Sequence, residues 1–266
     1  MNAYLDSARQ AARAAGEIIR LRFGTRVGVH HKGPIDLVTE VDLACERLIL
    51  DILQKDWPDH DILGEEGGRT GHGQGPLWIV DPLDGTRSFA HGYPFVSVSI
   101  GLEIEGKVRL GVVYDPIRDE LFEAIQGHGA HLNGQPIGVS STRHLKDALL
   151  VTGFPYHLAE IDNQALFDLF REMVVHSGGI RRDGSAALDF CYLACGRLDG
   201  YWEFFLKPWD AAAGALIAHE AGATVTNLGG QPYELRQAEV LVSNGHIHQE
   251  MIERARPFLQ PMRRWL

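Results

Sequence analysis

The chain contains few cysteines and no long apolar run, and each shortage excludes a class of protein. Its three cysteines, Cys45, Cys191 and Cys195, are an odd number without pair-like spacing, so we interpret them as reduced residues of the core. No apolar stretch approaches the roughly 20 residues that cross a bilayer. The N-terminus alternates charged with apolar residues, unlike a signal peptide. We therefore expect a cytoplasmic protein without a membrane anchor.

Basic residues and several catalytic motifs are also scarce. Lysine and arginine number 25 against 35 acidic residues, which gives a net charge of −10 and argues against a protein held to nucleic acid or anionic lipid by overall charge. The sequence has no nucleophile-elbow serine, no cysteine in an activating motif and no GxxxxGK[ST] loop. Covalent acyl chemistry and ATP hydrolysis are thereby disfavoured.

Apolar periodicity predicts alternating helices and strands, and therefore a layered protein of mixed α and β structure. Residues 95–125 have the pattern of an antiparallel meander, and a glycine-rich segment at 67–75 predicts a mobile loop. The other expected elements are helices at 4–24, 40–55, 162–176, 208–221 and 246–259, a helix opening at 184, and strands at 60–66, 77–81, 148–154, 200–205, 223–228 and 239–244. A change of pattern near residue 145 predicts an N-terminal α+β half (1–145), with an antiparallel sheet and metal-binding loops, and a C-terminal α/β half (146–266), in one compact unit.

The stretch Trp78–Thr86 carries the strongest chemical signal. Three apolar residues predict a buried strand, and Asp81 and Asp84 follow at its end, where α/β proteins place ligands. Pro82 fixes the chain direction, so both carboxylates and the Leu83 carbonyl can face one point. Hard oxygen donors of this kind suit Mg²⁺. Considered alone, the segment also fits a simple Asp-Pro-x-Asp-Gly surface turn.

Further features agree with a phosphate and metal site, although most of them also have an ordinary structural explanation. Amides of a helix beginning after Gly85 would seat a phosphate. Glu65 ends another apolar strand, and Asp210 in the first turn of a helix would also be stabilised by the helix dipole alone. Asp42 matches a capping box with Thr39. Converging carboxylates at these positions indicate a magnesium phosphatase, which holds two or more cations against phosphate.

Four segments resemble the inositol monophosphatase family and most closely its bacterial members. They are GEE at 64–66, WIVDPLDGT at 78–86, GSAALDFCYLACGRLDGYWEFFLKPWDAAAG at 184–214 and EAGA at 220–223. The similarity runs in order along nearly the whole chain, and the paired DPxDGT and PWD motifs are highly specific. The resemblance implies an α-β-α-β-α sandwich of the inositol monophosphatase and fructose bisphosphatase type, usually as a homodimer. It also implies Mg²⁺-dependent, Li⁺-sensitive hydrolysis of a phosphate monoester.

The same resemblance implies two or three Mg²⁺ ions and their ligands. Glu65, Asp81 and the Leu83 carbonyl would hold the first ion, Asp81, Asp84 and Asp210 the second, and Asp42 with Glu65 a third, weaker one. In the implied mechanism, a metal-bound water oriented by Thr86 and by Asp42 or Glu65 attacks phosphorus in line, without a covalent intermediate. Amides of Gly85 and Thr86 would cradle the phosphate.

Substrate contacts are implied at the other end of the site. Glu203 matches the family's acid that hydrogen-bonds a sugar or inositol hydroxyl, and Ala186 matches a small residue beneath the ring. Asp210 is also expected to contact the substrate, and the expected substrate is inositol 1- or 4-monophosphate. Considered alone, Glu203 could be an exposed strand acid. Arg181 and Arg182 could approach the substrate, lie in solvent or face a second subunit.

Two other functions remain open. The segment Asp84–Phe89 reads DGTRSF, where many inositol monophosphatases read DGTTNF, and this version looks more like the related histidinol-phosphate phosphatases. Some bacterial members of the family act in RNA polymerase antitermination complexes, so binding to RNA polymerase or RNA is a regulatory alternative. The complete set of acids favours catalysis.

Overall fold

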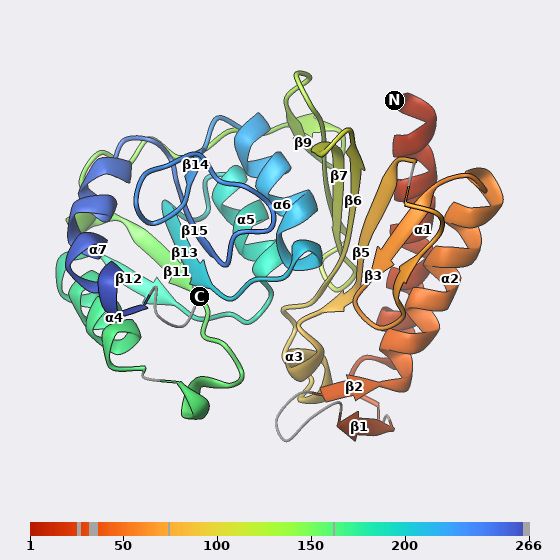
Figure 1. The fold of residues 1–266 in the computed structure, drawn as a ribbon, viewed down its shortest axis with the longest axis horizontal. Coiled ribbons are helices and arrows are strands. Elements are labelled where there is room, and N and C mark those ends of the chain that lie inside the picture. Colours follow the sequence, from red (N-terminus) through yellow and green to blue (C-terminus); the bar gives the residue numbers. More distant parts are fainter. Residues whose placement is uncertain (26–27, 32–36, 74, 162, 263–266) are drawn as a thin grey trace.

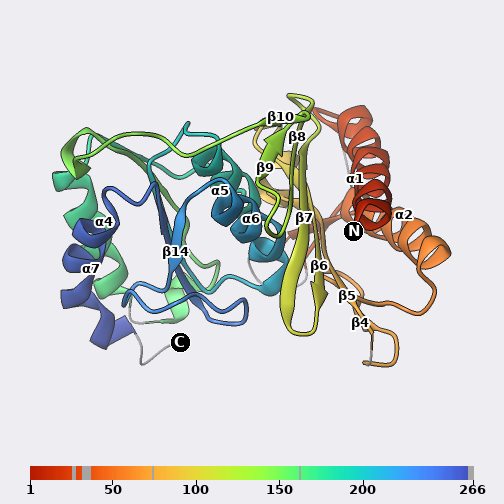
Figure 2. The ribbon, with the colours of Figure 1, turned by 90° about the horizontal axis from the view of Figure 1, so that it is seen from above.

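Layers of helices and β-sheets alternate across the molecule (Figures 1 and 2). The structure, a computed structural model, describes residues 1–25, 28–31, 37–73, 75–161 and 163–262. From one side of Figure 1 to the other, the layers are helices α1 and α2, the larger sheet, helices α5 and α6, the smaller sheet, and helices α4 and α7; among the described residues the larger sheet has eight strands and the smaller sheet five. This α-β-α-β-α order confirms the expected fold class.

The first helical layer covers one face of the larger sheet. Helix α1 (Asn2–Arg22) packs beside α2 (Glu40–Asp56) because its small apolar residues, Ala8, Ala12 and Ala15, form a buried stripe. The larger sheet has the order β10 (Gln135–Pro136), β9 (Ala130–Leu132), β8 (Glu120–Ile125), β7 (Lys107–Asp115), β6 (Ser97–Ile104), β5 (Leu77–Asp84), β3 (Asp61–Gly64) and β4 (Gly68–Thr70). A separate pair, β1 (Val29–His31) and β2 (Leu37–Thr39), precedes α2.

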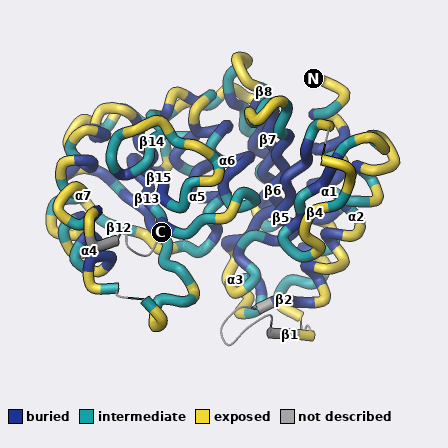
Figure 3. Tube along the Cα trace, viewed as in Figure 1, coloured by how far each residue is buried: buried dark blue, intermediate teal, exposed yellow. Residues whose placement is uncertain are grey.

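Helices α5 (Ala186–Ala194) and α6 (Pro208–Glu220) fill the space between the two sheets, as Figure 2 shows from above. A helix between two sheets needs apolar residues all around, and α6 is rich in alanine. Small residues let it approach closely: a Cβ on Gly111 of β7 would lie 2.7 Å from the Ala213 carbonyl oxygen. Figure 3 shows burial concentrated in the strands and in these two helices.

The smaller sheet has the order β12 (Gly179–Arg181), β11 (Leu149–Thr152), β13 (Gly200–Phe204), β15 (Glu239–Ser243) and β14 (Thr224–Thr226). Its side chains alternate between the two faces. Tyr201 packs with α5 and α6, whereas Trp202 packs with α4 (Gln164–His176) and α7 (His248–Met262) on the outer face. This alternation places Glu203 on the same face as Tyr201.

The structure differs from the sequence expectations at several short elements. The prediction of a mobile loop across the glycine-rich segment is wrong for Gly68–Thr70, because these residues form β4 and pair with β3. Strands β1, β2 and β12 were not expected at all, and α1 ends at Arg22 rather than Gly24. The single-turn helices η1 (Leu145–Asp147) and η2 (Leu158–Glu160) also lie outside the expectations.

The proposed boundary near residue 145 stays a prediction. The larger sheet ends with β10 and the smaller begins with β11, but α6 packs against β6 and β7 of the larger sheet. The cysteines are unpaired, with Cys45 and Cys191 in the core and Cys195 at its margin. Among the helices that the structure describes, none has the length and apolar character of a membrane span.

His248 at the start of α7 predicts an acid sensitivity of folding. Its Nε2 and Nδ1 lie 2.9 Å from the hydroxyl oxygens of Thr226 and Ser243, and burial lowers the pKa of its imidazole to about 4. Between about pH 6.5 and pH 4 the unfolded chain therefore binds a proton at this position that the native chain does not, so stability falls as the pH falls.

We expect this group alone to lower the free energy of unfolding by about 2 kcal/mol between pH 7 and pH 5. His248→Gln, which has no imidazole to titrate, should remove that part of the pH dependence in urea unfolding experiments. An unchanged difference between pH 7 and pH 5 in the variant would contradict the assignment.

Candidate active site

Strand β5 delivers two aspartates to one end of the larger sheet. It is buried along most of its length and pairs in parallel with β3 and antiparallel with β6. Pro82 has no N–H for the ladder, and the register with β6 shifts between Asp81 and Asp84. In this irregular turn the Leu83 N–H donates to Asp81 Oδ1 over 3.0 Å. The expected strand end with its aspartates is thus present.

Gly85 makes the turn from β5 into α3 (Thr86–Ala90). Its φ of 92° lies in the left-handed region, and a Cβ there would stand 2.8 Å from the Phe95 carbonyl oxygen. A side chain at this position would therefore clash with backbone. The residue that follows, Thr86, places its hydroxyl 3.1 Å from the Leu83 carbonyl oxygen and so joins the two sides of the turn.

Two further acids reach the same place from other elements. Glu65 follows β3, and its N–H donates to the Val80 carbonyl of β5 over 3.2 Å. Asp210 lies in the first turn of α6, where its Oδ2 accepts from the Lys207 N–H over 2.6 Å. The residues that line the resulting cavity of about 70 Å³ are Glu65, Asp81, Leu83, Asp84, Gly85, Thr86, Arg87, Tyr156 and Asp210.

The acids of this cavity repel one another. Burial raises the pKa of Asp81 well above its ordinary value, and the charges of Glu65, Asp84 and Asp210 raise it further. Burial also raises the pKa of Asp84 to about 6 and that of Asp210 well above its usual range. Such a group of carboxylates is stabilised by positive charge.

The donor set fits Mg²⁺, because carboxylate and carbonyl oxygens are its preferred protein ligands. The buried Leu83 contributes a carbonyl beside the four acids. Within the described ranges, no three carboxylate, imidazole or thiol groups are already gathered at ligand spacing around one point.

Asp42 lies behind the cavity rather than in its wall. Its Oδ2 accepts from the Thr39 N–H over 2.9 Å and from the Thr39 hydroxyl over 2.5 Å, which confirms the capping box. Its Oδ1 accepts from the Thr86 hydroxyl over 2.8 Å. The fully buried Asp42 therefore contacts the cavity through Thr86.

A larger cavity of about 480 Å³ adjoins the small one, and the two share Glu65, Asp84, Tyr156 and Asp210 in their walls. This volume is within the range of small-molecule sites. Ala186 and Glu203 line it.

Glu203 is held within the wall of the larger cavity rather than exposed on its strand. Its Oε2 accepts from the Tyr201 hydroxyl over 2.6 Å, and burial raises the pKa of its carboxyl group to about 7 while the charge of Arg182 lowers it. The neighbouring Gly153 makes room for this side chain: a Cβ there would lie 1.9 Å from Glu203 Oε1.

Several cavity residues were not identified from the sequence. Gly153, Tyr156 and Asp189 line the larger cavity. Of the arginine pair, Arg182 lines it too, whereas Arg181 does not. The Arg87 guanidinium stacks 4.9 Å from the centre of the Tyr156 ring. Tyr156 lies in a loop after β11, where the sequence has no pattern that could have revealed it.

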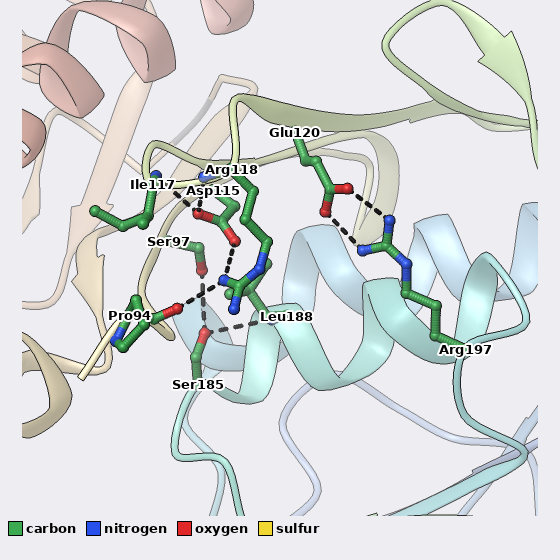
Figure 4. Close-up of polar contacts among 9 residues, drawn as sticks. All are labelled: Pro94, Ser97, Asp115, Ile117, Arg118, Glu120, Ser185, Leu188 and Arg197. Carbon is green, nitrogen blue, oxygen red and sulfur yellow. Dashed lines mark hydrogen bonds and ion pairs between the residues drawn. The ribbon is translucent and has the colours of Figure 1, made fainter.

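The N-terminus of α5 is tied to the strand ends. The Ser185 hydroxyl donates to Asp84 Oδ2 over 2.6 Å, and the Ala187 N–H donates to the same oxygen over 2.8 Å. Figure 4 shows Ser185 beside Ser97 of β6, with their hydroxyl oxygens 3.2 Å apart.

The segment that follows α3 is braced by an arginine. In the same view, Arg118 bridges Asp115 of β7 and the Pro94 carbonyl, over 2.8 and 2.6 Å. These contacts fix the backbone against which Gly85 packs.

Comparison with known proteins gives consistent results. The family model described as the inositol monophosphatase family matches residues 1–260. The Nus factor SuhB of Pseudomonas aeruginosa is 43% identical over 268 residues, 98% of each chain. An inositol-1-monophosphatase of Synechocystis is 46% identical over 254 residues, 94% of this chain and 88% of the relative. Among solved structures, the extragenic suppressor protein suhB of Bartonella henselae has a TM-score of 0.90 at 39% identity, covering 95% of this chain and 98% of that one. The inositol monophosphatase of Anabaena has a TM-score of 0.85 at 42% identity over 99% of both chains.

Proposed function

This chain belongs to the inositol monophosphatase family of phosphatases, and from that premise we propose that it hydrolyses inositol 1- or 4-monophosphate with Mg²⁺. The observation that carries the proposal is the position of Glu65, Asp81, Asp84 and Asp210 around one small cavity. This cavity opens into a larger one that contains Glu203. The arrangement offers a cation and phosphate site beside a site for a hydroxylated ring.

In this proposal Glu65, Asp81 and the Leu83 carbonyl hold one ion, and Asp81, Asp84 and Asp210 hold a second. Glu65 and Asp42 would complete a third, weaker site. The chemistry that such ions supply is activation of water and neutralisation of charge on the phosphate oxygens.

The Thr86–Asp42 pair orients the attacking water. The Thr86 hydroxyl donates to Asp42, whose other oxygen is fixed by Thr39. The Thr86 oxygen is therefore directed so that it can accept a proton from water, and Asp42 can take up the hydroxyl proton. Glu65, in the wall of the same cavity, is the other group that could orient this water. Water then attacks phosphorus in line, the bond between phosphorus and the ester oxygen breaks, and the leaving alkoxide takes up a proton from solvent, so that inorganic phosphate and the alcohol form without a covalent intermediate. The amides of Gly85 and Thr86, at the start of α3, would cradle the phosphate.

The larger cavity would bind the alcohol part of the substrate. Glu203, oriented by Tyr201, accepts hydrogen bonds from ring hydroxyls, and Ala186 lies beneath the ring. Asp210 stands in the walls of both cavities and would contact the substrate near the ester oxygen.

Gly153→Ala tests the role of Glu203. Because the new Cβ would lie 1.9 Å from Glu203 Oε1, the carboxylate must move. We expect kcat/KM for inositol 1-phosphate to fall roughly 10- to 100-fold, since a misplaced polar contact weakens recognition of a hydroxyl. Hydrolysis of p-nitrophenyl phosphate, which has no ring hydroxyls, should change little. Gly138→Ala is a matched control, since its nearest contact would be 3.7 Å away. Equal losses on both substrates would argue against hydroxyl recognition by Glu203.

Phosphate release from a substrate panel tests the proposed function. The panel contains inositol 1-phosphate, histidinol phosphate and fructose 1,6-bisphosphate, each without metal, with Mg²⁺, and with Mg²⁺ plus Li⁺. We expect preference for inositol 1-phosphate, dependence on Mg²⁺ and inhibition by Li⁺. Preference for histidinol phosphate would overturn the substrate assignment in favour of the alternative that Arg87 and Ser88 suggest.

A regulatory role is a second candidate, supported by relatives named Nus factor SuhB at 43% and 42% identity. We propose that the chain, as a homodimer, can also associate with RNA polymerase or RNA. Co-elution with RNA polymerase at low and high salt tests this, and light scattering gives the oligomeric state. Co-elution that persists in a catalytically silent Asp84→Asn variant would separate the two roles.

A further inference from the structure

Glu46 joins helix α2 to the loop that carries Glu65. It lies one helical turn after Asp42, and the residue is 6% exposed. Both carboxylate oxygens bind backbone amides: the Glu66 N–H donates to Oε2 over 2.9 Å and the Gly67 N–H donates to Oε1 over 2.6 Å. The loop that begins with Glu65 is therefore fastened to α2 immediately after that residue.

The loop lies flush against this carboxylate. A Cβ on Gly64 would stand 2.4 Å from Glu46 Oε2, and one on Gly67 would stand 2.9 Å from Oε1. Glycines therefore flank Glu65 and Glu66 where a side chain would push the loop away. A glutamine at position 46 would keep the length of the side chain but could accept only one of the two amide bonds.

We propose that Glu46 is a positioning residue that sets the location of Glu65 for cation binding. The inference rests on the proposed function, in which Glu65 is a metal ligand. One turn of α2 then controls two parts of the site: Asp42 orients Thr86, and Glu46 holds the loop that carries Glu65. Groups that orient metal ligands in this way commonly change metal affinity 10- to 100-fold when mutated.

The test compares Glu46→Gln with a matched control at the far end of α6. Glu220 also accepts two loop amides, from Gly127 over 2.8 Å and from Gly129 over 2.9 Å, but neither of these loop residues lines the two cavities. We expect Glu46→Gln to weaken Mg²⁺ binding about tenfold in calorimetry and to raise the Mg²⁺ concentration for half-maximal activity equally. Turnover at saturating Mg²⁺ should stay within about threefold of wild type, and Glu220→Gln should match wild type throughout.

Gly67→Ala provides a second test if Glu46→Gln does not fold. It keeps Glu46 but forces the loop away from the carboxylate, so the same loss of Mg²⁺ affinity is expected. Unchanged Mg²⁺ affinity in a folded variant, or an equal loss in Glu220→Gln, would overturn the proposal. Calorimetry keeps the two claims separate: wild-type protein that binds Mg²⁺ without hydrolysing any ester overturns the proposed function alone. Wild-type protein that binds no Mg²⁺ overturns both.

Discussion

Asp84→Asn is expected to lose at least roughly 100-fold in turnover while the protein stays folded, because the change removes the negative charge of a proposed metal ligand and keeps the shape of the side chain. The carbonyl oxygen of the asparagine can still accept from the Ser185 hydroxyl and the Ala187 N–H, so the bond between the β5 end and α5 persists. Phosphate release at saturating Mg²⁺ and circular dichroism measure the two parts of this expectation.

Although the turnover of Asp84→Asn should fall, the stability of the metal-free variant should be equal to that of wild type or higher. Asp84 adds to the repulsion that raises the pKa of Asp81 and Asp210. A neutral residue relieves that repulsion, so the metal-free variant should unfold at the same temperature as wild type or a higher one. Its stabilisation by Mg²⁺ should shrink. Asp51→Asn, an exposed acid on α2, should leave turnover and both unfolding temperatures unchanged. Retained turnover in Asp84→Asn would refute the metal assignment.

Thr86→Val is the second change with a large expected effect. Valine keeps the branched shape but has no hydroxyl, so the contact between the cavity and Asp42 Oδ1 is lost. We expect kcat to fall roughly 100-fold or more, the range for loss of a group that transfers a proton. The buried oxygen of Asp42 also loses its donor, which should cost about 1–3 kcal/mol of stability.

The kinetic pattern distinguishes this variant from Asp84→Asn. Thr86 is not a proposed ligand, so half-maximal activity should need nearly the same Mg²⁺ concentration as in wild type. Thr86→Ser restores the hydroxyl and should stay within about tenfold of wild-type turnover. If Thr86→Val were as active as Thr86→Ser, the Thr86–Asp42 pair would have no part in water activation.

The β5 end could be predicted from the sequence because its determinants are local. An apolar run specifies the strand, Pro82 interrupts its ladder, and Gly85 supplies the left-handed turn. Tyr156 could not be predicted in the same way. It reaches the cavity only because the smaller sheet packs beside the larger one, and no local pattern records that arrangement.

Asp42 shows a different limit of sequence interpretation. In the sequence a capping box and a metal-ligand position were alternatives for Asp42, and the structure contains the capping box together with a contact to Thr86 of the cavity. One oxygen caps α2 through Thr39 and the other accepts from Thr86. A carboxylate has two acceptor atoms, so one residue can satisfy two patterns.

Short strands limit prediction from the sequence for a simpler reason. The three residues of β4 are too few to show an alternating pattern, and the glycines around them favour the prediction of a loop.

The two sheets contribute to opposite ends of the paired cavities, and this arrangement bears on how such a protein can diverge. Asp81 and Asp84 come from a strand of the larger sheet, whereas Glu203 and Gly153 belong to the smaller sheet and the loop beside it. In the proposed function, substitutions in the smaller sheet would therefore select a new alcohol without disturbing the acids proposed to bind the cations and phosphate. We expect that gene duplication, followed by changes confined to β13 and the loop after β11, would produce an enzyme with the same chemistry and a different substrate specificity.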